Sequence, residues 1–341
     1  MRIVLVGEAN EGSRTPQRLR ALRDLGHEVT MVATTPPGWR YETKPGLLER
    51  LRYRLRLPAD AAGANQALLT AAQGAELVIL DNARSIRPAT LRTVRERAPG
   101  IRLVWYSEDD SMNPIHRTRW MEGAMALFDL WVTTKSFNAD PGEVPSLGVR
   151  RVLVVDNSYC PHAHAPIDPD GRFAAQVSFV GTHEAPRAAD LLALAEAGIP
   201  VRVWGNGWGG LAGRSPNLRV ENAPVYGDDY RRVVCSSSIN LCFLRKGNRD
   251  RQTCRSLEIP AMGGFMAHED SAEVARLLAP DREAAYFADT AELIGQCRRW
   301  LADDQGRRAV AEAGRLRVEA DGHSHARRWA QILEEVIPAS H

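Results

Sequence analysis

Short apolar runs that alternate with helical patterns constrain the fold of this chain more than any other feature. The run RIVLVG at 2–7 is followed by the helical pattern TPQRLRALRDLG at 15–26 and by a second apolar run at 27–34. Strand, helix and strand with short connections form the unit of a parallel sheet flanked by helices. Further apolar runs follow at 75–81, 101–107, 127–134 and 149–156. The first half is therefore predicted to be a doubly wound α/β domain.

The same rhythm restarts after a break, which predicts a second domain. The segment NSYCPHAHAPIDPDG at 157–171 has three prolines and no periodicity, as expected of a linker. Apolar runs then recur at 175–181, 201–205, 237–244 and 265–269, and helical patterns occupy 290–320 and 324–337. We expect two Rossmann-like, doubly wound domains that face each other across a central cleft, with ligands beyond the carboxyl ends of the strands. The expected segments are a first domain at 1–156, a linker at 157–172, a second domain at 173–322 and a helical segment at 323–341 that packs back toward the first domain.

Composition and motifs narrow the classes of function. The net charge of +2 gives no indication of a nucleic-acid partner. The five cysteines form no C-x-x-C pair, which favours a reduced, cytoplasmic protein without structural zinc. His162 and His164 alone are poor evidence for a metal, so no metal site is expected. The loop GEANEGSR at 7–14 lacks G-x-G-x-x-G spacing, and no G-x-x-x-x-G-K-[ST] or G-x-S-x-G motif occurs. Nicotinamide, flavin and phosphate-loop enzymes are therefore not expected.

Small and polar residues follow two strands of the second half. FVGTHEAPR at 179–187 and VWGNGWGG at 203–210 end strands on glycines, which let a ligand approach the backbone closely. The candidate ligand-binding residues in these loops are Gly181, Thr182, Arg187, Gly205 and Asn206.

The stretch FLRKGNRDRQTCRSLE at 243–258 places five basic residues before a helix. Pro260 is poorly tolerated deep inside a helix, so the helix is expected to begin near 253–256. A helix start with flanking arginines suits a phosphate or diphosphate. Glu258, in the first turn, either complements the helix dipole or contacts a ligand.

The chain from SINLCFLRKGNRDRQTCRSLEIPAMGGF to HARRWAQIL, residues 238–333, resembles the C-terminal domain of CgeB-like (spore-maturation-type) glycosyltransferases, relatives of the family-4 GT-B enzymes. The resemblance extends back to 179–187 and to the linker VVDNSYCPHAHAPI. Over residues 1–150 it consists of the Rossmann-like rhythm and the motif WYSEDD at 105–110. It implies a GT-B fold and a nucleotide-sugar donor, with no cofactor.

Family-4 enzymes carry two glutamates eight positions apart. The second matches Glu258, whereas the first falls on Asp250, whose shorter side chain departs from the pattern. The resemblance implies that Glu258 holds the ribose hydroxyls and that Asp250 lies near the transferred sugar. It also implies that Lys246, Arg251 or Arg255 faces the diphosphate.

Transfer of a sugar requires that the departing nucleoside diphosphate be stabilised as negative charge develops on it. Fixed basic groups supply this, so no obligatory divalent cation is expected. The family relatives retain anomeric configuration and need no protein base. An inverting enzyme would need one from the first domain, where Asp109, Asp110 and His116 are the candidates. The alternative interpretation of these residues is a solvated loop with capping aspartates.

The acceptor is not identified by any motif, although the first domain is expected to bind it. LLERLRYRLRL at 47–57 places four leucines on one helical face, with arginines largely elsewhere. The segment favours either peripheral contact with an anionic membrane or lipid-linked acceptor, or an ordinary helix with a solvated basic face. Two rival functions stay open: a sugar-nucleotide 2-epimerase, and a catalytically silent binding or assembly protein. The Asp250 departure keeps the silent protein open, whereas intact Arg255 and Glu258 argue against it. If Glu258 and Arg255 face a solvent-filled cleft, neither should matter much to folding.

Overall fold

The computed structural model describes residues 1–336, which form two compact units. Unit 1 comprises Met1–Asp156, Lys246–Asp250 and the chain from His325, and unit 2 comprises Asn157–Arg245 and Arg251–Ser324. Residues 246–250 fall in the second domain as the sequence divides it, but they belong to unit 1. Positions 337–341, at the end of the segment 323–341, lie outside the described residues.

The core of unit 1 is a six-stranded parallel sheet in the order β2-β1-β3-β4-β5-β6. Its strands are β1 (Arg2–Gly7), β2 (Glu28–Ala33), β3 (Leu77–Asp81), β4 (Arg102–Ser107), β5 (Leu130–Thr133) and β6 (Val152–Val154). All six were predicted from the apolar runs. The central strands read as continuous apolar runs because helices bury both of their faces.

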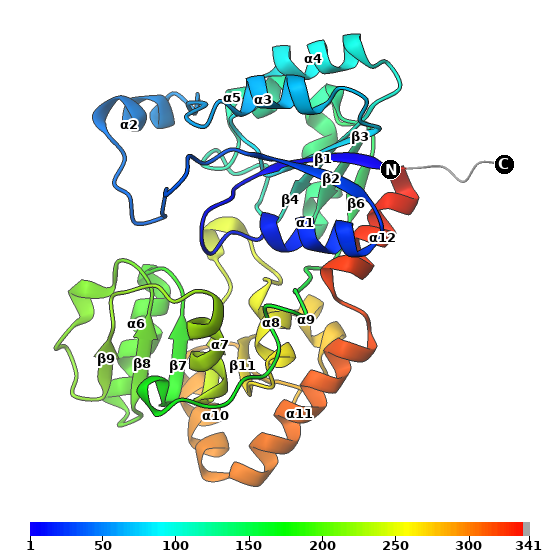
Figure 1. Ribbon diagram of the computed structural model, residues 1–341. Coiled ribbons are helices and arrows are strands. Elements are labelled where there is room, and N and C mark those ends of the chain that lie inside the picture. The colour runs from blue at the N-terminus through cyan, green and yellow to red at the C-terminus, as the bar shows by residue number, and fades with distance from the viewer. Residues whose placement is uncertain (337–341) are drawn as a thin grey trace. The chain divides into compact units, whose positions relative to one another are not determined.

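Helices cover the unit 1 sheet on both sides (Figure 1). One face packs against α3 (Ala64–Ala71), α4 (Pro88–Arg97) and α5 (Arg119–Ala124). The other face packs against α1 (Thr15–Asp24) and α12 (His325–Val336), where the Trp329 ring lies 5.3 Å from that of Tyr106. The remaining helix, α2 (Leu47–Arg54), buries none of its residues.

The core of unit 2 is a second six-stranded parallel sheet, in the order β12-β11-β10-β7-β8-β9. Its strands are β7 (Ala175–Val180), β8 (Val201–Trp204), β9 (Leu218–Val220), β10 (Ser237–Cys242), β11 (Met266–Glu269) and β12 (Ala285–Phe287). The sequence predicted four of them. It missed β9 and β12, which have three residues each.

The helices of unit 2 also lie on both faces of its sheet. One core contains side chains of α6 (Ala185–Glu196) and α10 (Thr290–Ala302), and the other those of α7 (Gly227–Cys235), α8 (Arg255–Ala261) and α9 (Ala272–Leu277). The predicted helical region 290–320 divides at Asp303, whose carboxylate caps α11 (Asp304–Ala320). Within residues 1–336, no helix is long and apolar enough to cross a bilayer.

Candidate functional site

Each sheet has one point where the strand order reverses, and ligands of doubly wound sheets bind at the carboxyl ends of the strands beside it. The reversal lies between β7 and β10 in unit 2 and between β1 and β3 in unit 1. Most residues singled out from the sequence follow β7, β8, β10 or β4. We therefore expect ligand-binding residues at the carboxyl edges of the two sheets, one in each unit.

Two glycine loops form the floor of the unit 2 edge. Gly205 has φ +136°, and a Cβ on it would lie 2.0 Å from the carbonyl oxygen of Gly181, so only glycine fits. The backbone N–H of His183 donates to the carbonyl of Asn206 at 2.9 Å, which joins the loop after β7 to the loop after β8. Thr182 is exposed on this floor.

Arg187 lies in the first turn of α6, beside this floor, and is only 7% exposed. Its Nη1 makes a long hydrogen bond of 3.4 Å to the Thr182 carbonyl and lies 3.8 Å from Glu184. Its Nε is buried and has no hydrogen-bond partner in the described part of the chain. Burial lowers the pKa of Arg187 below its ordinary value; Glu184 opposes this, and the like charges of Arg255 and Arg245 add to it. The edge therefore holds a buried cation that its protein neighbours do not fully neutralise.

Arg255, the first residue of α8, provides a second guanidinium near Arg187. Its Nε is also buried without a hydrogen-bond partner among residues 1–336. Its positive charge acts on both Arg187 and the Cys242 thiol at the end of β10. The helices that follow β7 and β10, on the two sides of the strand-order reversal, thus each supply a buried N–H donor that has no acceptor within the described residues. Such donors are suited to an anion with several oxygens.

The other basic residues predicted to face a diphosphate are exposed. Arg251 is exposed and lies 3.6 Å from Glu273. Lys246 is exposed in the short helical turn η6 (Lys246–Asn248), which belongs to unit 1. Of the three candidates, Arg255 is the one whose charge acts on Arg187.

Glu258 lies one turn into α8 and is only 2% exposed. The Tyr230 hydroxyl donates to its Oε2 at 3.3 Å, and His164 Nε2 lies 3.8 Å from its Oε1. His164 Nδ1 accepts a hydrogen bond from the Cys160 backbone, so in the neutral ring Nε2 carries the proton and faces Glu258. Glu258 is therefore not on an open surface, and its replacement is expected to affect stability as well as binding. Neither neighbour was predicted from the sequence.

In unit 1, Asp109 and His116 lie together in the chain that follows β4. His116 Nδ1 is 3.7 Å from Asp109 Oδ2, and the same carboxylate is bound by the side chains of Arg84 and Asn82. The Asp109 carboxylate is thus held by Arg84 and Asn82 and lies beside the His116 ring.

Asp110 is occupied by structural contacts. It accepts hydrogen bonds from Arg249 at 2.6 and 2.9 Å and from Asn138 at 3.0 Å, and Arg249 also binds Glu143. Burial alone would raise the pKa of Asp110, but the bonds from Arg249 and Asn138 outweigh it, so the pKa lies below its ordinary value. This carboxylate is poorly suited to act as a general base.

Asp250 forms a buried ion pair within unit 1. Its Oδ1 lies 2.6 Å from the Nζ of Lys135 and accepts a hydrogen bond of 2.7 Å from Asn248, and both side chains of the ion pair are 3% exposed. The pair fixes the segment 246–250 to the end of β5. Lys135 was not predicted because 115 residues separate it from Asp250.

The reversal point of the unit 1 sheet carries a network that the sequence did not reveal. Asp81, at the end of β3, accepts hydrogen bonds from Arg18 Nη1 and Thr15 Oγ1, each at 2.7 Å, and Arg18 also pairs with Glu108. Burial acts to lower the pKa of Arg18, but the two carboxylates raise it above its ordinary value. The position of Asp81 at the end of an apolar run is a sequence signal that could have identified it as a candidate site residue. Arg18 has no such signal in the sequence.

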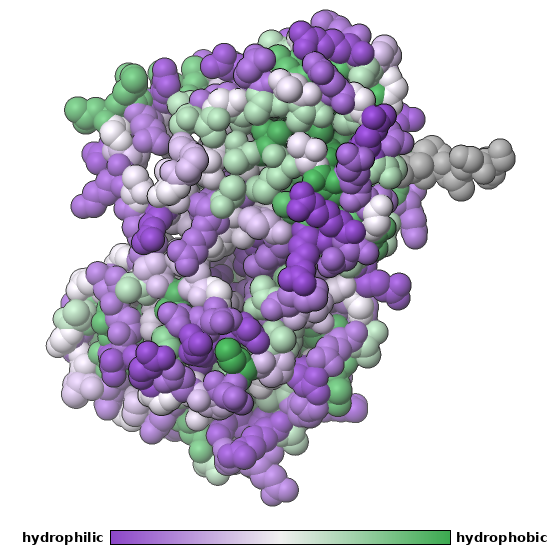
Figure 2. Space-filling view, in the orientation of Figure 1, coloured by the Kyte–Doolittle hydropathy of each residue, from purple (hydrophilic) through white to green (hydrophobic). Residues whose placement is uncertain are grey.

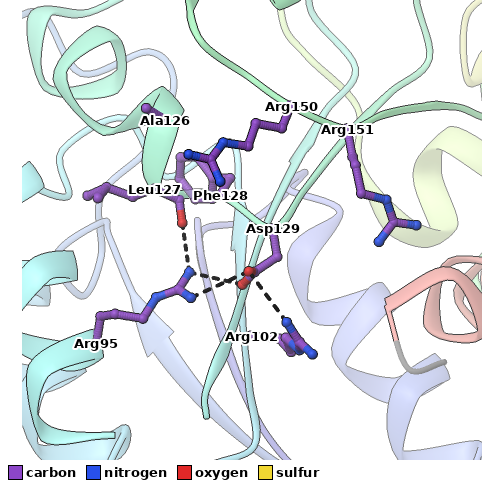
Figure 3. Close-up of a pocket in the computed structure, with 8 residues that line it drawn as sticks. All are labelled: Arg95, Arg102, Ala126, Leu127, Phe128, Asp129, Arg150 and Arg151. Carbon is purple, nitrogen blue, oxygen red and sulfur yellow. Dashed lines mark hydrogen bonds and ion pairs between the residues drawn. The ribbon is translucent and has the colours of Figure 1, made fainter. Parts of the chain in front are cut away.

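A cavity of about 420 Å³ lies at the opposite, amino edge of the unit 1 sheet. Figure 3 shows Arg95 and Arg102 directed at the carboxylate of Asp129, which also accepts the backbone N–H of Leu103 at 2.8 Å. The remaining lining residues are Ala126, Leu127, Phe128, Arg150 and Arg151. Because the charge is largely paired and the position is not a strand carboxyl end, we do not assign this cavity to the functional site.

Comparisons with known proteins agree with this geometry. Residues 187–334 match the family model described as glycosyl transferase-like, a region that begins at Arg187 and includes Arg255 and Glu258. No curated protein matches the chain.

Solved structures resemble the whole chain at low sequence identity. Sucrose-phosphate synthase from Thermosynechococcus elongatus has a TM-score of 0.69 at 14% identity and covers 100% of both chains. An alpha-glucosyltransferase in complex with UDP has a TM-score of 0.68 at 13% identity, covering 98% of this chain and 99% of that one. Anabaena HepE in complex with UDP-glucose has a TM-score of 0.62 at 12% identity, covering 98% and 100%. The chain therefore has the GT-B fold.

Proposed function

We propose that this protein is a glycosyltransferase of the CgeB-like type that takes its sugar from a nucleoside diphosphate sugar. One observation carries the proposal. Arg187 and Arg255 present two buried guanidinium N–H groups, without acceptors among residues 1–336, at the glycine-lined carboxyl edge of the unit 2 sheet. The family-model match over 187–334 and the UDP-containing structures of the same fold support the same conclusion.

A diphosphate suits this edge better than a single carboxylate. Burial lowers the pKa of Arg187, and the like charge of the nearby Arg255 lowers it further. An anion with oxygens on two phosphorus atoms can accept from both guanidinium groups at once. The adjoining glycines bring the loops after β7 and β8 together beside Arg187, because the Phe179 ring and the Gly181 carbonyl occupy the space that Cβ atoms on Gly181 and Gly205 would need.

Glu258 is proposed to accept hydrogen bonds from the ribose hydroxyls, as in the family it resembles. A carboxylate offers two oxygens to a vicinal diol, and Glu258 lies one turn after Arg255 on α8. For Asp250 we propose a different role from the family's sugar contact. Its carboxylate is bound to Lys135 in a buried pair, so it positions the segment 246–250.

In the proposed reaction, the bond between the sugar's anomeric carbon and the diphosphate oxygen breaks, and the electron pair stays on that oxygen. Arg187 and Arg255 stabilise the charge that develops there, so no divalent cation is required. The acceptor oxygen bonds to the anomeric carbon, and its proton passes to the departing phosphate if configuration is retained. If configuration is inverted, His116, oriented by Asp109, is the proposed base.

The acceptor and the compartment are also matters of proposal. We assign the acceptor to unit 1, whose carboxyl edge carries His116 and Asp109. The five cysteines are all free, which supports an activity in the reducing cytoplasm.

The proposal is tested by incubating the full chain with UDP-, GDP- and dTDP-sugars in EDTA, with and without candidate acceptors, and separating the products chromatographically. A glycosyltransferase is expected to release the nucleoside diphosphate together with a glycosylated acceptor or free sugar, and Arg255→Gln should slow this release. Conversion of the donor to an epimeric nucleotide sugar would replace the proposal with the epimerase. If no donor is consumed, or if consumption depends on added Mg²⁺ or Mn²⁺, the proposed mechanism is wrong.

A further inference from the structure

Helix α2 of unit 1 exposes an unusual amount of apolar side chain. Leu47, Leu48, Leu51 and Leu55 are 86%, 63%, 53% and 45% exposed, and no residue of the helix is buried. Figure 2 shows hydrophobic atoms on the surface at the position of α2. A surface helix normally buries such a face, so contiguous exposed leucines indicate a contact with something outside the unit.

The charges of α2 are arranged around this leucine face. Successive helical residues are about 100° apart, which places the four leucines within an arc of about 100°. On the same helical count, Arg50 and Arg54 fall on one edge of the arc and Arg52 on the other. The apolar face therefore has basic residues on both sides, with Glu49 on the opposite face of the helix.

These basic charges are poorly compensated by the protein. Positions 44–56 contain five basic residues and the single acidic residue Glu49. Arg56 pairs with Glu122 at 2.7 Å, whereas the structure shows no acidic partner for Arg52 or Arg54 within residues 1–336. The segment thus offers an unneutralised positive potential together with its leucines.

The segment that follows the C-terminal end of α2 is bonded to α5, which attaches the helix and its leucine face to unit 1. The Arg56 carbonyl accepts the backbone N–H of Arg119 at 2.8 Å, and the Trp120 indole N–H donates to the Pro58 carbonyl at 3.2 Å. These bonds and the Arg56–Glu122 pair join the end of α2 to α5. In Figure 1, α2 projects from unit 1 beyond this attachment.

We propose that α2 docks unit 1 onto an anionic lipid bilayer. The leucines enter the boundary between headgroups and acyl chains, while the flanking arginines extend to the lipid phosphates. Charge complementarity favours this partner over a second protein, because the uncompensated arginines on both edges match a continuous negative surface. The short helix makes the association reversible. The inference concerns unit 1 alone and does not depend on the proposed sugar transfer.

Flotation of the full chain with vesicles tests the proposal. The chain is expected to bind vesicles made of equal parts phosphatidylglycerol and phosphatidylcholine, and this binding should weaken at high ionic strength. Binding to vesicles of pure phosphatidylcholine should be at least about tenfold weaker. The double variant Leu48→Glu/Leu51→Glu should bind at least about tenfold more weakly. Leu316→Glu, which changes an equally exposed leucine on α11, should bind as the wild type does.

A second double variant and its control measure what the arginines of α2 contribute to vesicle binding. Arg52→Gln/Arg54→Gln should weaken binding to anionic vesicles about 25-fold, since each basic residue near such a surface is worth about fivefold. Arg92→Gln/Arg97→Gln, an exposed pair on α4, should leave binding unchanged. Equal binding to neutral and anionic vesicles, or wild-type binding by the α2 variants, would overturn the proposal. So would a dimer in light scattering that the leucine variants dissociate without any vesicle binding, because α2 would then be a protein interface.

Discussion

Replacing Arg187 with glutamine should separate donor binding from stability. Glutamine keeps a polar side chain but loses the charge and most of the N–H donors that face the proposed diphosphate. Hydrogen bonds to a charged group contribute about 1.5–3 kcal/mol. Affinity for the nucleoside diphosphate that binds the wild type best should therefore fall about 10- to 150-fold.

The stability of Arg187→Gln should not fall with its affinity for the nucleotide. Arg187 is charged in both the folded and the unfolded chain at neutral pH, so its lowered folded-state pKa means that its charge disfavours folding. Its intramolecular contacts are long, at 3.4 Å to Thr182 and 3.8 Å to Glu184. Arg187→Gln is therefore expected to melt at the wild-type temperature or above it. A site residue whose removal stabilises the fold is typical of a residue kept for function.

Arg202 on β8 provides the matched control, because it is a similarly buried arginine of unit 2 whose guanidinium is fully engaged. It binds Glu221 and the Arg172 carbonyl, each at 2.7 Å. Arg202→Gln should cost about 2–4 kcal/mol, or roughly 5 to 15 °C in melting temperature, while donor affinity stays unchanged. Calorimetric titration beside a melting curve measures both quantities. If Arg187→Gln lost stability as Arg202→Gln does and bound nucleotide normally, the anion-site interpretation would be refuted.

Three further predictions concern the carboxylates. Glu258→Gln should weaken donor binding about 10- to 100-fold, and it should also lower the melting temperature because the side chain is buried; unchanged nucleotide titration would show that Glu258 serves packing alone. Asp250→Asn should cost about 3–5 kcal/mol in urea unfolding because it leaves Lys135 buried and unpaired, and adding Lys135→Met should recover much of this loss. Arg249→Gln should be less stable than the wild type at neutral pH, with the difference shrinking as the pH falls below about 4. The bonds from Arg249 lower the pKa of Asp110 in the folded chain, so they stabilise the fold when the pH is above the pKa of this carboxyl in the unfolded chain. This stabilisation is lost as Asp110 is protonated, and a stability difference that does not change with pH would contradict the prediction.

The sequence was informative where structure follows from local pattern. The apolar runs predicted ten of the strands because each is a short apolar segment between turn or helix signals, as at 2–7 and 101–107. The start of α8 was predicted because Pro260 limits how far a helix can extend before it. The glycine loops after β7 and β8 were recognisable because a close backbone approach requires glycine at Gly205.

The parts that escaped prediction depend on residues that meet only in three dimensions. Lys135 has no local signal that marks it as the partner of Asp250. The burial of Glu258 could not be read from α8, because Tyr230 comes from α7 and His164 from a segment without regular structure. The same composition that predicted an amphipathic helix at 47–57 could not reveal that its leucines would be left without a covering element.

The most direct test of the central claim is calorimetric titration of UDP, GDP and dTDP into the full chain in the presence of EDTA. The account predicts that one of them binds with a stoichiometry of one per chain and stabilises the fold, by about 2.7 kcal/mol at a concentration one hundred times its Kd. It also predicts that Arg187→Gln and Arg255→Gln each weaken this binding. If no nucleoside diphosphate binds at millimolar concentration, or if binding is indifferent to both substitutions, the carboxyl edge of the unit 2 sheet is not a donor site.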